Sequence, residues 1–275
     1  MRRRPASALV LLSLAFGLPS SALAQSAADL ASIRAEIQAL RESQDATRKD
    51  VEAIRALLEQ AMGPRPAGSV PGAPAAAAVP TAPLKIAGRP AKGSPKALVT
   101  VIEFSDYACP YCGQYATQVF PQIDRDYVKT NKIRYVFKSY PIAQLHPNAF
   151  RAHEAAACAG DQGRYWEMHD RLFADQRTLT LEGFAERAVA LGLDAAKLRT
   201  CIEGPAHDDQ IREDIDDALR GGVRGTPVFV LAFTDPKGEV AKPARVLVGA
   251  QPYQAFKEAI DALLAQAATQ PPGQQ

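Results

Sequence analysis

The 275-residue chain has little net charge, few cysteines and no long hydrophobic segment beyond its N-terminus. Its 32 basic and 30 acidic residues nearly cancel, so nucleic acid and strongly charged membrane surfaces are not indicated as partners. Only four cysteines are present, and a second closely spaced pair is missing, which argues against a four-cysteine zinc ribbon. The chain is long enough for one sizeable core plus an appendage.

The N-terminus has the features of an export signal. Three arginines at positions 2–4 precede the apolar stretch 8–18, which is too short to span a bilayer. The small-x-small motif Ala22-Leu23-Ala24 is typical of a cleavage site. We therefore expect residues 1–24 to be a cleaved signal peptide and the mature protein to enter an oxidising compartment, a bacterial periplasm.

Residues 28–61 show a heptad repeat. Apolar residues recur at steps of three and four from Leu30 to Leu58, with arginines at the e positions and Glu36 and Asp50 at g positions. This pattern predicts a coiled-coil stalk over residues 25–62 through which the protein self-associates. The alternative is an amphipathic helix that packs on its own globular part. Eight prolines in residues 63–95 predict a semi-rigid, solvated linker.

The most informative motif joins an apolar run to two closely spaced cysteines. The strand-like residues 97–104 deliver Cys109 and Cys112 to the start of a predicted helix. Pro110 suits the first helical position, and the helix N-terminus favours a thiolate on Cys109. A thiolate beside a second thiol can attack a disulfide and then be released by its partner. We predict a dithiol–disulfide exchange centre, with a structural disulfide or half of a metal site as the alternatives.

The elements that follow predict an α/β fold. A helix over 113–129 and a strand over 133–137 complete a strand–helix–strand unit with parallel strands. Five helices, a two-stranded hairpin and a final helix should follow. We expect a thioredoxin-like fold over residues 96–267, with a helical domain inserted at about 146–221 and a short tail at 268–275. The predicted later elements are helices at 148–159, 165–174, 181–191, 195–201 and 206–220, strands at 228–233 and 244–248, and a helix at 253–267.

From about Leu84 to Gln266 the chain resembles the DsbA family of thiol-disulfide oxidoreductases, in the subgroup that includes BdbD and ScsC-like proteins. The N-terminal stalk is not part of the common DsbA pattern, but it resembles the oligomerising stalk of ScsC-like proteins. Three local motifs carry the resemblance: Glu103-Phe104-x4-Cys109-Pro110-Tyr111-Cys112, Gly225-Thr226-Pro227 before a strand, and Ala157-Cys158-Ala159 within the inserted helices.

The resemblance implies a role for each motif. Cys109 would be the nucleophile and Cys112 the more buried, resolving thiol. Glu103 would be the buried acid behind the pair, and burial would raise its pKa so that it could accept a proton from Cys112. The alternative for Glu103 is a strand-end carboxylate that reaches water. No cofactor and no metal are expected.

Four residues are expected to contact substrate: Pro110, Tyr111, Thr226 and Pro227. The resemblance implies a cis peptide at Thr226-Pro227 that faces the active site, and X-Pro bonds are the ones that adopt cis at low cost. The backbone of Thr226 would then be free to pair with an extended substrate peptide. The alternative is an ordinary trans proline at the start of a strand.

Cys158 and Cys201 are the remaining cysteines. An even number of cysteines in an exported protein favours a second, structural disulfide between them. Two buried free thiols are the alternative.

The direction of electron flow stays open. A stalk-mediated oligomer slightly favours a disulfide isomerase or reductase, whereas Pro110 favours a more oxidising, DsbA-type oxidase. The expected partners are unfolded or misoxidised exported proteins and a membrane redox partner, DsbD-like or DsbB-like. A reading of another class is a copper(I)-binding or holdase envelope protein, because soft thiolates at Cys109 and Cys112 suit copper(I).

Overall fold

The computed structural model describes residues 33–53 and 79–269. The chain divides into two compact units, residues 1–71 and 72–275, which are described separately. In the first unit, residues 33–53 form one α-helix, so the predicted N-terminal helix is confirmed over this range. All of its side chains are exposed, including the apolar heptad residues Ile33, Ile37, Leu40 and Val51. The predicted signal peptide and the two ends of the predicted stalk lie outside the described residues.

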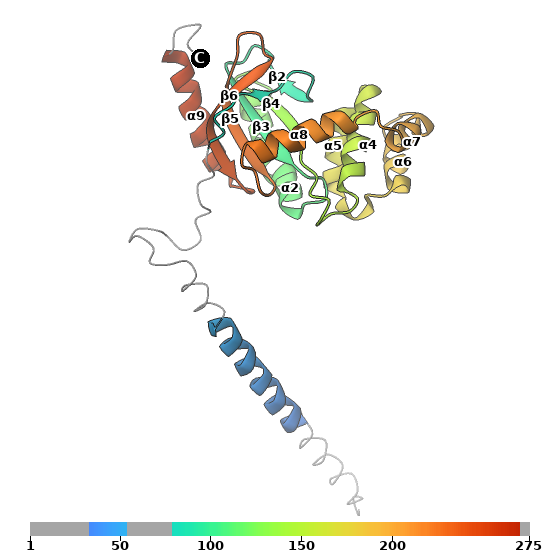
Figure 1. Cartoon of the computed structure of the whole chain (residues 1–275), viewed down its shortest axis with the longest axis vertical. Coiled ribbons are helices and arrows are strands. Elements are labelled where there is room, and N and C mark those ends of the chain that lie inside the picture. The colour runs from blue at the N-terminus through green and yellow to red at the C-terminus, as the bar shows by residue number, and fades with distance from the viewer. Residues whose placement is uncertain (1–32, 54–78, 270–275) are drawn as a thin grey trace, which may run out of the picture. The chain divides into compact units, whose positions relative to one another are not determined.

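One mixed six-stranded sheet forms the centre of the second unit (Figure 1). The strand order is β1-β6-β5-β3-β4-β2. Strands β3 and β4 are parallel, as the strand–helix–strand pattern predicts, and the other neighbouring pairs are antiparallel. The strands are β1 (Leu84–Lys85), β2 (Ala91–Gly93), β3 (Val99–Ser105), β4 (Arg134–Ser139), β5 (Val228–Thr234) and β6 (Val240–Val248).

Strand β3 is central, and all seven of its residues are buried. Its side chains alternate between the two faces of the sheet. Val99 and Val101 belong to one hydrophobic cluster, whereas Ile102 and Phe104 belong to a second cluster on the opposite face. A strand buried on both faces needs a nearly continuous apolar sequence, which is why this run was recognisable.

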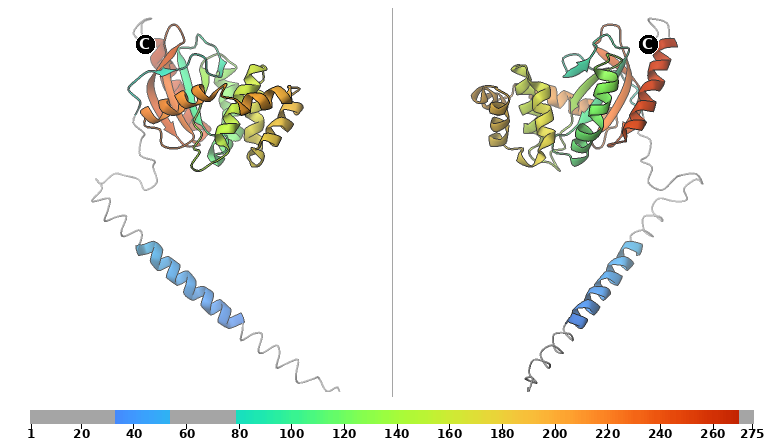
Figure 2. Two further views of the ribbon diagram at one scale, coloured as in Figure 1. Left: turned by 45° about the vertical axis from the view of Figure 1, so that its right-hand side comes forward. Right: turned by 180° about the vertical axis from the view of Figure 1, so that it is seen from behind.

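Helices cover both faces of the sheet (Figure 2). The crossover from β3 to β4 is a continuous helical segment of four pieces, and its buried side chains pack with those of α9 against one face. Helix α8 contributes to the cluster on the other face. The pieces of the crossover are α2 (Pro110–Gln114), η1 (Tyr115–Val119), α3 (Phe120–Ile123) and η2 (Asp124–Val128); α8 spans Asp208–Arg220 and α9 spans Tyr253–Thr269.

The predicted helical insertion is present between β4 and β5. Its helices share a third hydrophobic cluster, which also contains Cys109 and Cys112. A disulfide between Cys158 and Cys201 joins α4 to α7. Besides α8, the insertion contains α4 (Ala149–Asp161), α5 (Tyr165–Ala174), η3 (Gln176–Thr178), α6 (Leu181–Ala190) and α7 (Ala195–Glu203).

A buried ionic network fastens α8 to the sheet. Lys138 of β4 is fully buried, and its ammonium contacts Asp217 and lies 3.1 Å from Asp214 Oδ1, both on α8. Asp214 also accepts a hydrogen bond from Arg89 Nε at 2.6 Å. Since a buried charge is costly without a partner, these groups depend on one another.

The predicted linker ends earlier than expected. The sequence placed residues 63–95 in a solvated tether, but β1 and β2 lie within this range, and Leu84 and Ile86 are buried. Strand β1 pairs with β6 and β2 pairs with β4. The two short strands therefore form the two opposite edges of the sheet. The prolines obscured two strands that are held by tertiary pairing rather than by local sequence.

Within the described ranges, the helices are too short or too polar to cross a bilayer.

Candidate active site

Cys109 lies where β3 turns into α2. The turn is held by Asp106, whose Oδ1 accepts a hydrogen bond from the Ala108 N–H at 2.8 Å and whose carbonyl accepts one from the Cys109 N–H at 3.0 Å. Cys109 is the N-cap residue of α2 and has an extended backbone, and Pro110 follows as the first helical residue. The sequence therefore fixes the cysteine at the positive end of a helix, as the motif predicts.

Asp106 also joins this turn to the loop that precedes the insertion. Its Oδ2 accepts a hydrogen bond from the Ile142 N–H at 2.8 Å and lies 2.8 Å from His146 Nδ1. Asp106 is fully buried, so its carboxylate is satisfied by these backbone and side-chain partners rather than by water. His146 thus lies beside the active-site turn.

A residue of the insertion holds the other side of the turn. The amide Nε2 of Gln176 donates hydrogen bonds of 2.8 Å to the carbonyl oxygens of Tyr107 and Cys109. Its side chain lies over Gly113, where a Cβ atom would come within 2.5 Å of Gln176 Oε1. Glycine at this position therefore lets the inserted domain approach the first turn of α2.

Cys109 and Cys112 are free thiols, and their environments drive their acidities apart. The pKa of Cys109 falls to about 5, chiefly because the Cys112 thiol donates a hydrogen bond to its sulfur, with further help from Thr226 and the backbone N–H groups of Cys112 and Tyr111, while burial opposes the shift. Burial and the neighbouring Cys109 sulfur raise the pKa of Cys112 well above its ordinary value. At neutral pH the site holds one thiolate and one thiol.

Glu103 lies on β3 and is buried, so the alternative of a carboxylate that reaches water is wrong. Burial raises its pKa to about 7, against the opposing effects of the Tyr135 hydroxyl, which donates a hydrogen bond to it, and of the nearby Ser105 hydroxyl. Ser105 follows two residues later on the same face of the strand, and its hydroxyl also acts to lower the pKa of Cys112. The acid, the serine hydroxyl and the resolving cysteine therefore form one buried group.

Thr226 and Pro227 face Cys109 from the loop that precedes β5. Their peptide bond is cis, as the resemblance implied. The carbonyl oxygen of Thr226 lies 3.5 Å from Cys109 Sγ. The structure thus brings this loop and the cysteine pair together from positions that are far apart in the sequence.

Two large apolar side chains, one between the cysteines and one in the loop that contacts Asp106, are exposed. Tyr111, between the cysteines, is 65% exposed, and Leu145, next to His146, is 70% exposed. Pro110 is exposed as well.

Sequence reasoning missed three residues that build the site: Asp106, Gln176 and Tyr135. Asp106 carried a usable signal, because aspartate two residues before a backbone N–H favours a turn. Gln176 and Tyr135 carried none, since their partners Cys109 and Glu103 lie 67 and 32 residues away.

The site consists of a free dithiol at a helix N-terminus, a buried acid behind it and a cis-proline loop that faces it. This arrangement is that of a thioredoxin-like, thiol-disulfide oxidoreductase fold. The chain belongs to the thioredoxin family, whose model matches residues 86–262.

Solved structures of DsbA-type proteins share this fold. The alpha-DsbA1 of Wolbachia pipientis superimposes with a TM-score of 0.59 at 23% identity, over 67% of this chain and 95% of that chain. BdbD from Bacillus subtilis gives a TM-score of 0.58 at 22% identity, over 68% and 98%. A thioredoxin-like oxidoreductase from Silicibacter pomeroyi gives 0.54 at 28% identity, over 64% and 91%.

Curated relatives match a smaller part of the chain. The Na(+)/H(+) antiporter NhaA 1 of Salinispora arenicola is 44% identical over 141 residues, which are 50% of this chain and 21% of that protein. The antiporter NhaA 3 of Salinispora tropica is 38% identical over 138 residues, with the same coverage. The chain spans about a fifth of the length of these relatives, so their name describes those proteins and carries no activity to this one.

Proposed function

We propose that the protein is an exported thiol-disulfide oxidoreductase that donates its Cys109–Cys112 disulfide to thiols of other exported proteins. The observation that carries this proposal is the pair of opposed acidities, in which Cys109 has a pKa of about 5 and Cys112 a raised pKa. A substrate thiolate attacks Cys109 in the oxidised pair, and Cys112 leaves. A second substrate thiol then attacks the mixed disulfide at the substrate sulfur, and Cys109 leaves as a stable thiolate.

The stabilised thiolate supports this direction of exchange. A low pKa of Cys109 makes it a good leaving group and stabilises the reduced pair relative to the disulfide. A protein whose reduced form is stabilised gives up its disulfide readily. The chemistry of the site therefore favours an oxidase, whereas the predicted stalk taken alone favours an isomerase or reductase.

Glu103 supports the release of Cys112. With a pKa near 7, its carboxyl group can exchange a proton with the buried Cys112 thiol at neutral pH. The Ser105 hydroxyl lowers the pKa of both groups and offers a further hydroxyl for the same proton.

The reduction potential of the Cys109–Cys112 pair tests the direction. Equilibration of the protein in glutathione buffers should give a potential more oxidising than about −180 mV, the value of an isomerase. The same preparation should oxidise a reduced, unfolded substrate with two cysteines in stoichiometric amounts. A potential near about −270 mV, as in thioredoxin, would instead assign the protein to the reductases.

An isomerase or reductase is the second candidate, and one observation favours it. The helix over residues 33–53 exposes an apolar seam in which Ile37 and Leu40 are 47% and 65% exposed. Such a seam is typical of a helix that associates with copies of itself, and an oligomer can hold a misoxidised chain between catalytic domains. Refolding of a substrate with scrambled disulfides distinguishes this candidate, because an isomerase restores activity without added oxidant.

A membrane redox partner completes either cycle. An oxidase needs a DsbB-like partner that accepts its electrons, whereas an isomerase needs a DsbD-like partner that supplies them. The exposed side chains of Tyr111 and Leu145 offer apolar contacts for such partners and for substrates.

A further inference from the structure

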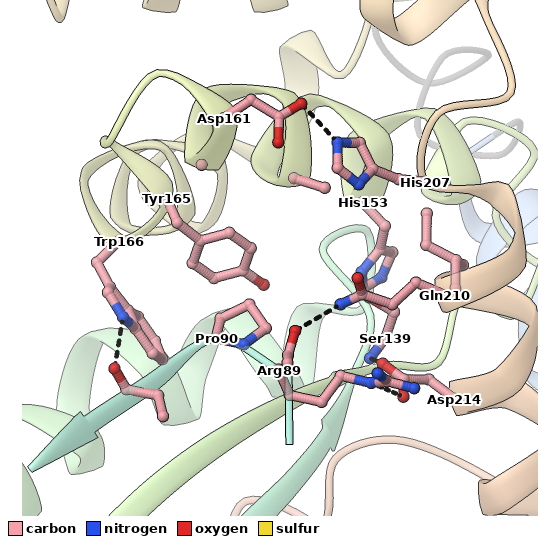
Figure 3. A pocket seen from close by; sticks show the side chains of 15 residues that line it. Arg89, Pro90, Ser139, His153, Asp161, Tyr165, Trp166, His207, Gln210 and Asp214 are labelled. Carbon is pink, nitrogen blue, oxygen red and sulfur yellow. Dashed lines mark hydrogen bonds and ion pairs between the residues drawn. The ribbon is translucent and has the colours of Figure 1, made fainter. Parts of the chain in front are cut away.

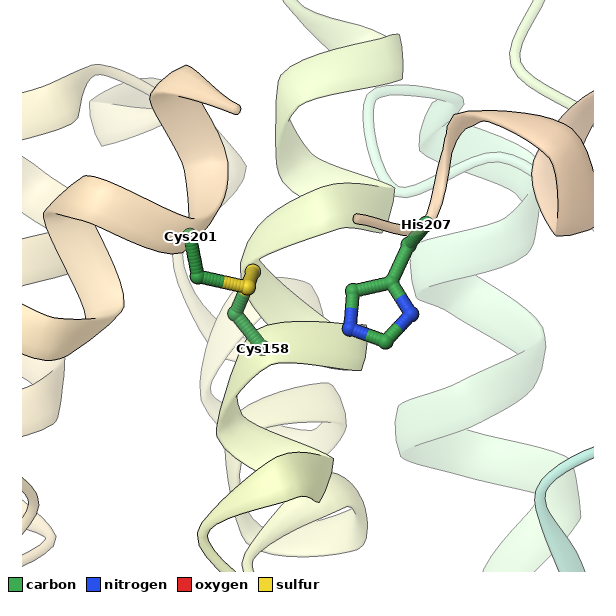
Figure 4. A group of neighbouring side chains, drawn as sticks. All are labelled: Cys158, Cys201 and His207. Atoms are coloured by element: carbon green, nitrogen blue, oxygen red, sulfur yellow. A yellow bond between two sulfur atoms is a disulfide. The ribbon is translucent and has the colours of Figure 1, made fainter. Parts of the chain in front are cut away.

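Metal-ligating side chains surround the disulfide of the inserted domain (Figure 4). One ligand atom from each of Cys158, Cys201 and His207 lies within 4.8 Å of the other two. A carboxylate joins them, because Asp161 Oδ2 lies 2.8 Å from His207 Nε2 and 3.7 Å from Cys201 Sγ. Two sulfurs, an imidazole and a carboxylate therefore meet at one place in the inserted domain.

Three neighbouring elements supply these groups. Helix α4 carries both Cys158 and Asp161, which are three residues apart and so share one face of the helix. Helix α7 carries Cys201, and His207 is the N-cap residue of α8. The tertiary structure thus presets the donors before any cation binds.

The donor set suits one class of cation after reduction. We propose that Cys158, Cys201, His207 and Asp161 bind Zn²⁺ once the Cys158–Cys201 disulfide is reduced. Zinc prefers four donors drawn from thiolate, imidazole and carboxylate in a tetrahedral arrangement. Its metal–sulfur distance of about 2.3 Å places two thiolates about 3.8 Å apart, a spacing that the cysteines reach only when the sulfur–sulfur bond is broken.

The reaction balances in two steps. A dithiol reductant transfers two electrons and two protons, so the Cys158–Cys201 bond breaks, two thiols form and the reductant becomes a disulfide. Zn²⁺ then displaces the two thiol protons to give two metal–thiolate bonds. His207 binds as the neutral imidazole and Asp161 as the carboxylate.

The site is open to solvent on one side. Asp161 and His207 also line a cavity of about 490 Å³ between α4, α8 and the segment that precedes β2, and their side chains point toward each other in it (Figure 3). The Asp161 side chain is 56% exposed, whereas Cys158 is buried. A cation can therefore enter past the carboxylate, while the apolar cluster around Cys158 shields the sulfur of that residue from water.

Cobalt spectroscopy on the full chain tests the proposal. Cys109→Ser and Cys112→Ser remove the other thiol pair, and a phosphine reduces the remaining disulfide without supplying a thiol. We expect Co²⁺ to produce a near-ultraviolet thiolate-to-cobalt band and the visible bands of a tetrahedral site, saturating at one ion per chain. Zn²⁺ should abolish both, and the untreated, oxidised protein should show neither.

Matched variants identify the ligands. His207→Ala and Asp161→Asn should each weaken Co²⁺ binding by more than about tenfold, whereas His146→Ala, which lies outside the cluster, should leave it unchanged. Circular dichroism shows whether each reduced variant is folded. Zn²⁺ should also raise the melting temperature of the reduced protein and not of the oxidised protein, which provides a second readout. The proposal is overturned if the folded, reduced protein gives no thiolate band, or if His207→Ala binds Co²⁺ as tightly as its parent.

Discussion

The hydroxyl of Tyr135 donates a hydrogen bond of 2.5 Å to Oε2 of Glu103, while the second carboxyl oxygen, Oε1, is buried without a hydrogen-bond partner. One strong donor does not replace the hydration of a charged carboxylate. The pair therefore explains why Glu103 holds its proton up to about pH 7. For the same reason, the ionised form of Glu103 lowers the stability of the folded state.

Glu103→Gln should stabilise the protein at alkaline pH. Burial raises the Glu103 pKa from 4.5 to about 7, so the folded state binds a proton that the unfolded state releases between these values. This contribution is full below pH 4.5 and is lost as the pH rises through 7, at a cost of about 3 kcal/mol. Urea unfolding should show a gain of up to about 3 kcal/mol at pH 8.5 and little change at pH 4. The exposed Glu186→Gln is the control, and an equal gain at both pH values would contradict the account.

Replacing Cys112 should raise the pKa of Cys109, because the largest stabilisation of the Cys109 thiolate comes from the Cys112 thiol. In the reduced wild type, the alkylation rate of Cys109 should have its midpoint near pH 5, with Cys112 modified much more slowly. Cys112→Ala removes the donor and should move the midpoint upward, whereas Cys112→Ser keeps a donor and should move it less. If Cys109 titrates alike in the two variants, the hydrogen bond from Cys112 is not the main cause of the low Cys109 pKa.

His153 should make the inserted domain sensitive to acid. Burial lowers its pKa from 6.5 to about 4, so the unfolded state takes up a proton first as the pH falls. The stability contributed by the neutral ring is present above pH 6.5 and declines by about 3 kcal/mol as the pH falls through 4. The difference in unfolding free energy between wild type and His153→Phe should follow this curve, and His153→Gln should give the same slope. A difference that is constant with pH would show that the His153 ring has the same pKa in the folded and unfolded states, so that burial does not shift it.

Removing the disulfide of the insertion should cost stability and spare catalysis. Cys158 and Cys201 are 43 residues apart, and opening a loop of this length lowers the unfolding free energy by up to about 4 kcal/mol in the chain-entropy model. The double variant Cys158→Ser/Cys201→Ser should melt at a lower temperature than the oxidised wild type and should match the wild type whose disulfide has been reduced. Exchange rates with a small disulfide should stay nearly unchanged. Loss of exchange without loss of stability would identify a second redox pair.

Leu40→Lys should break self-association through the N-terminal helix. Leu40 is 65% exposed on the helix over residues 33–53 and occupies a core position of the heptad seam. A charge at such a position is costly once two helices pack together. Light scattering should show an oligomer for the wild type and a smaller species for Leu40→Lys, while Gln38→Lys, on the outer face, should remain oligomeric. A monomeric wild type would end the proposal.

Local signals in the sequence predicted most of the fold. Strand β3 is buried on both faces and so is mostly apolar, and α5 begins and ends where its periodic pattern does. The two short strands before β3 were missed because they pair with distant strands and contain little apolar sequence of their own. A strand of two or three residues has no periodicity to detect.

The site also contains one part that the local sequence predicted and one part that it did not. The Cys109–Cys112 motif was predictable, since a helix N-terminus acts over a single turn. Contacts such as His146 with Asp106, which are 40 residues apart, depend on the path of the loop between them and leave no pattern in the sequence. The pKa of Cys109 was expected from the helix, yet Cys112 contributes more.

The contact of Lys138 with the acidic residues of α8 limits how far the chain can be shortened to a smaller catalytic unit. A shortened chain that omits the insertion would leave the Lys138 ammonium inside the sheet without Asp214 and Asp217. It would also leave Arg89 without its buried acceptor. Any engineered minimal domain must therefore replace both Lys138 and Arg89 with apolar side chains. Deleting the helices alone would leave two unpaired charges in the interior.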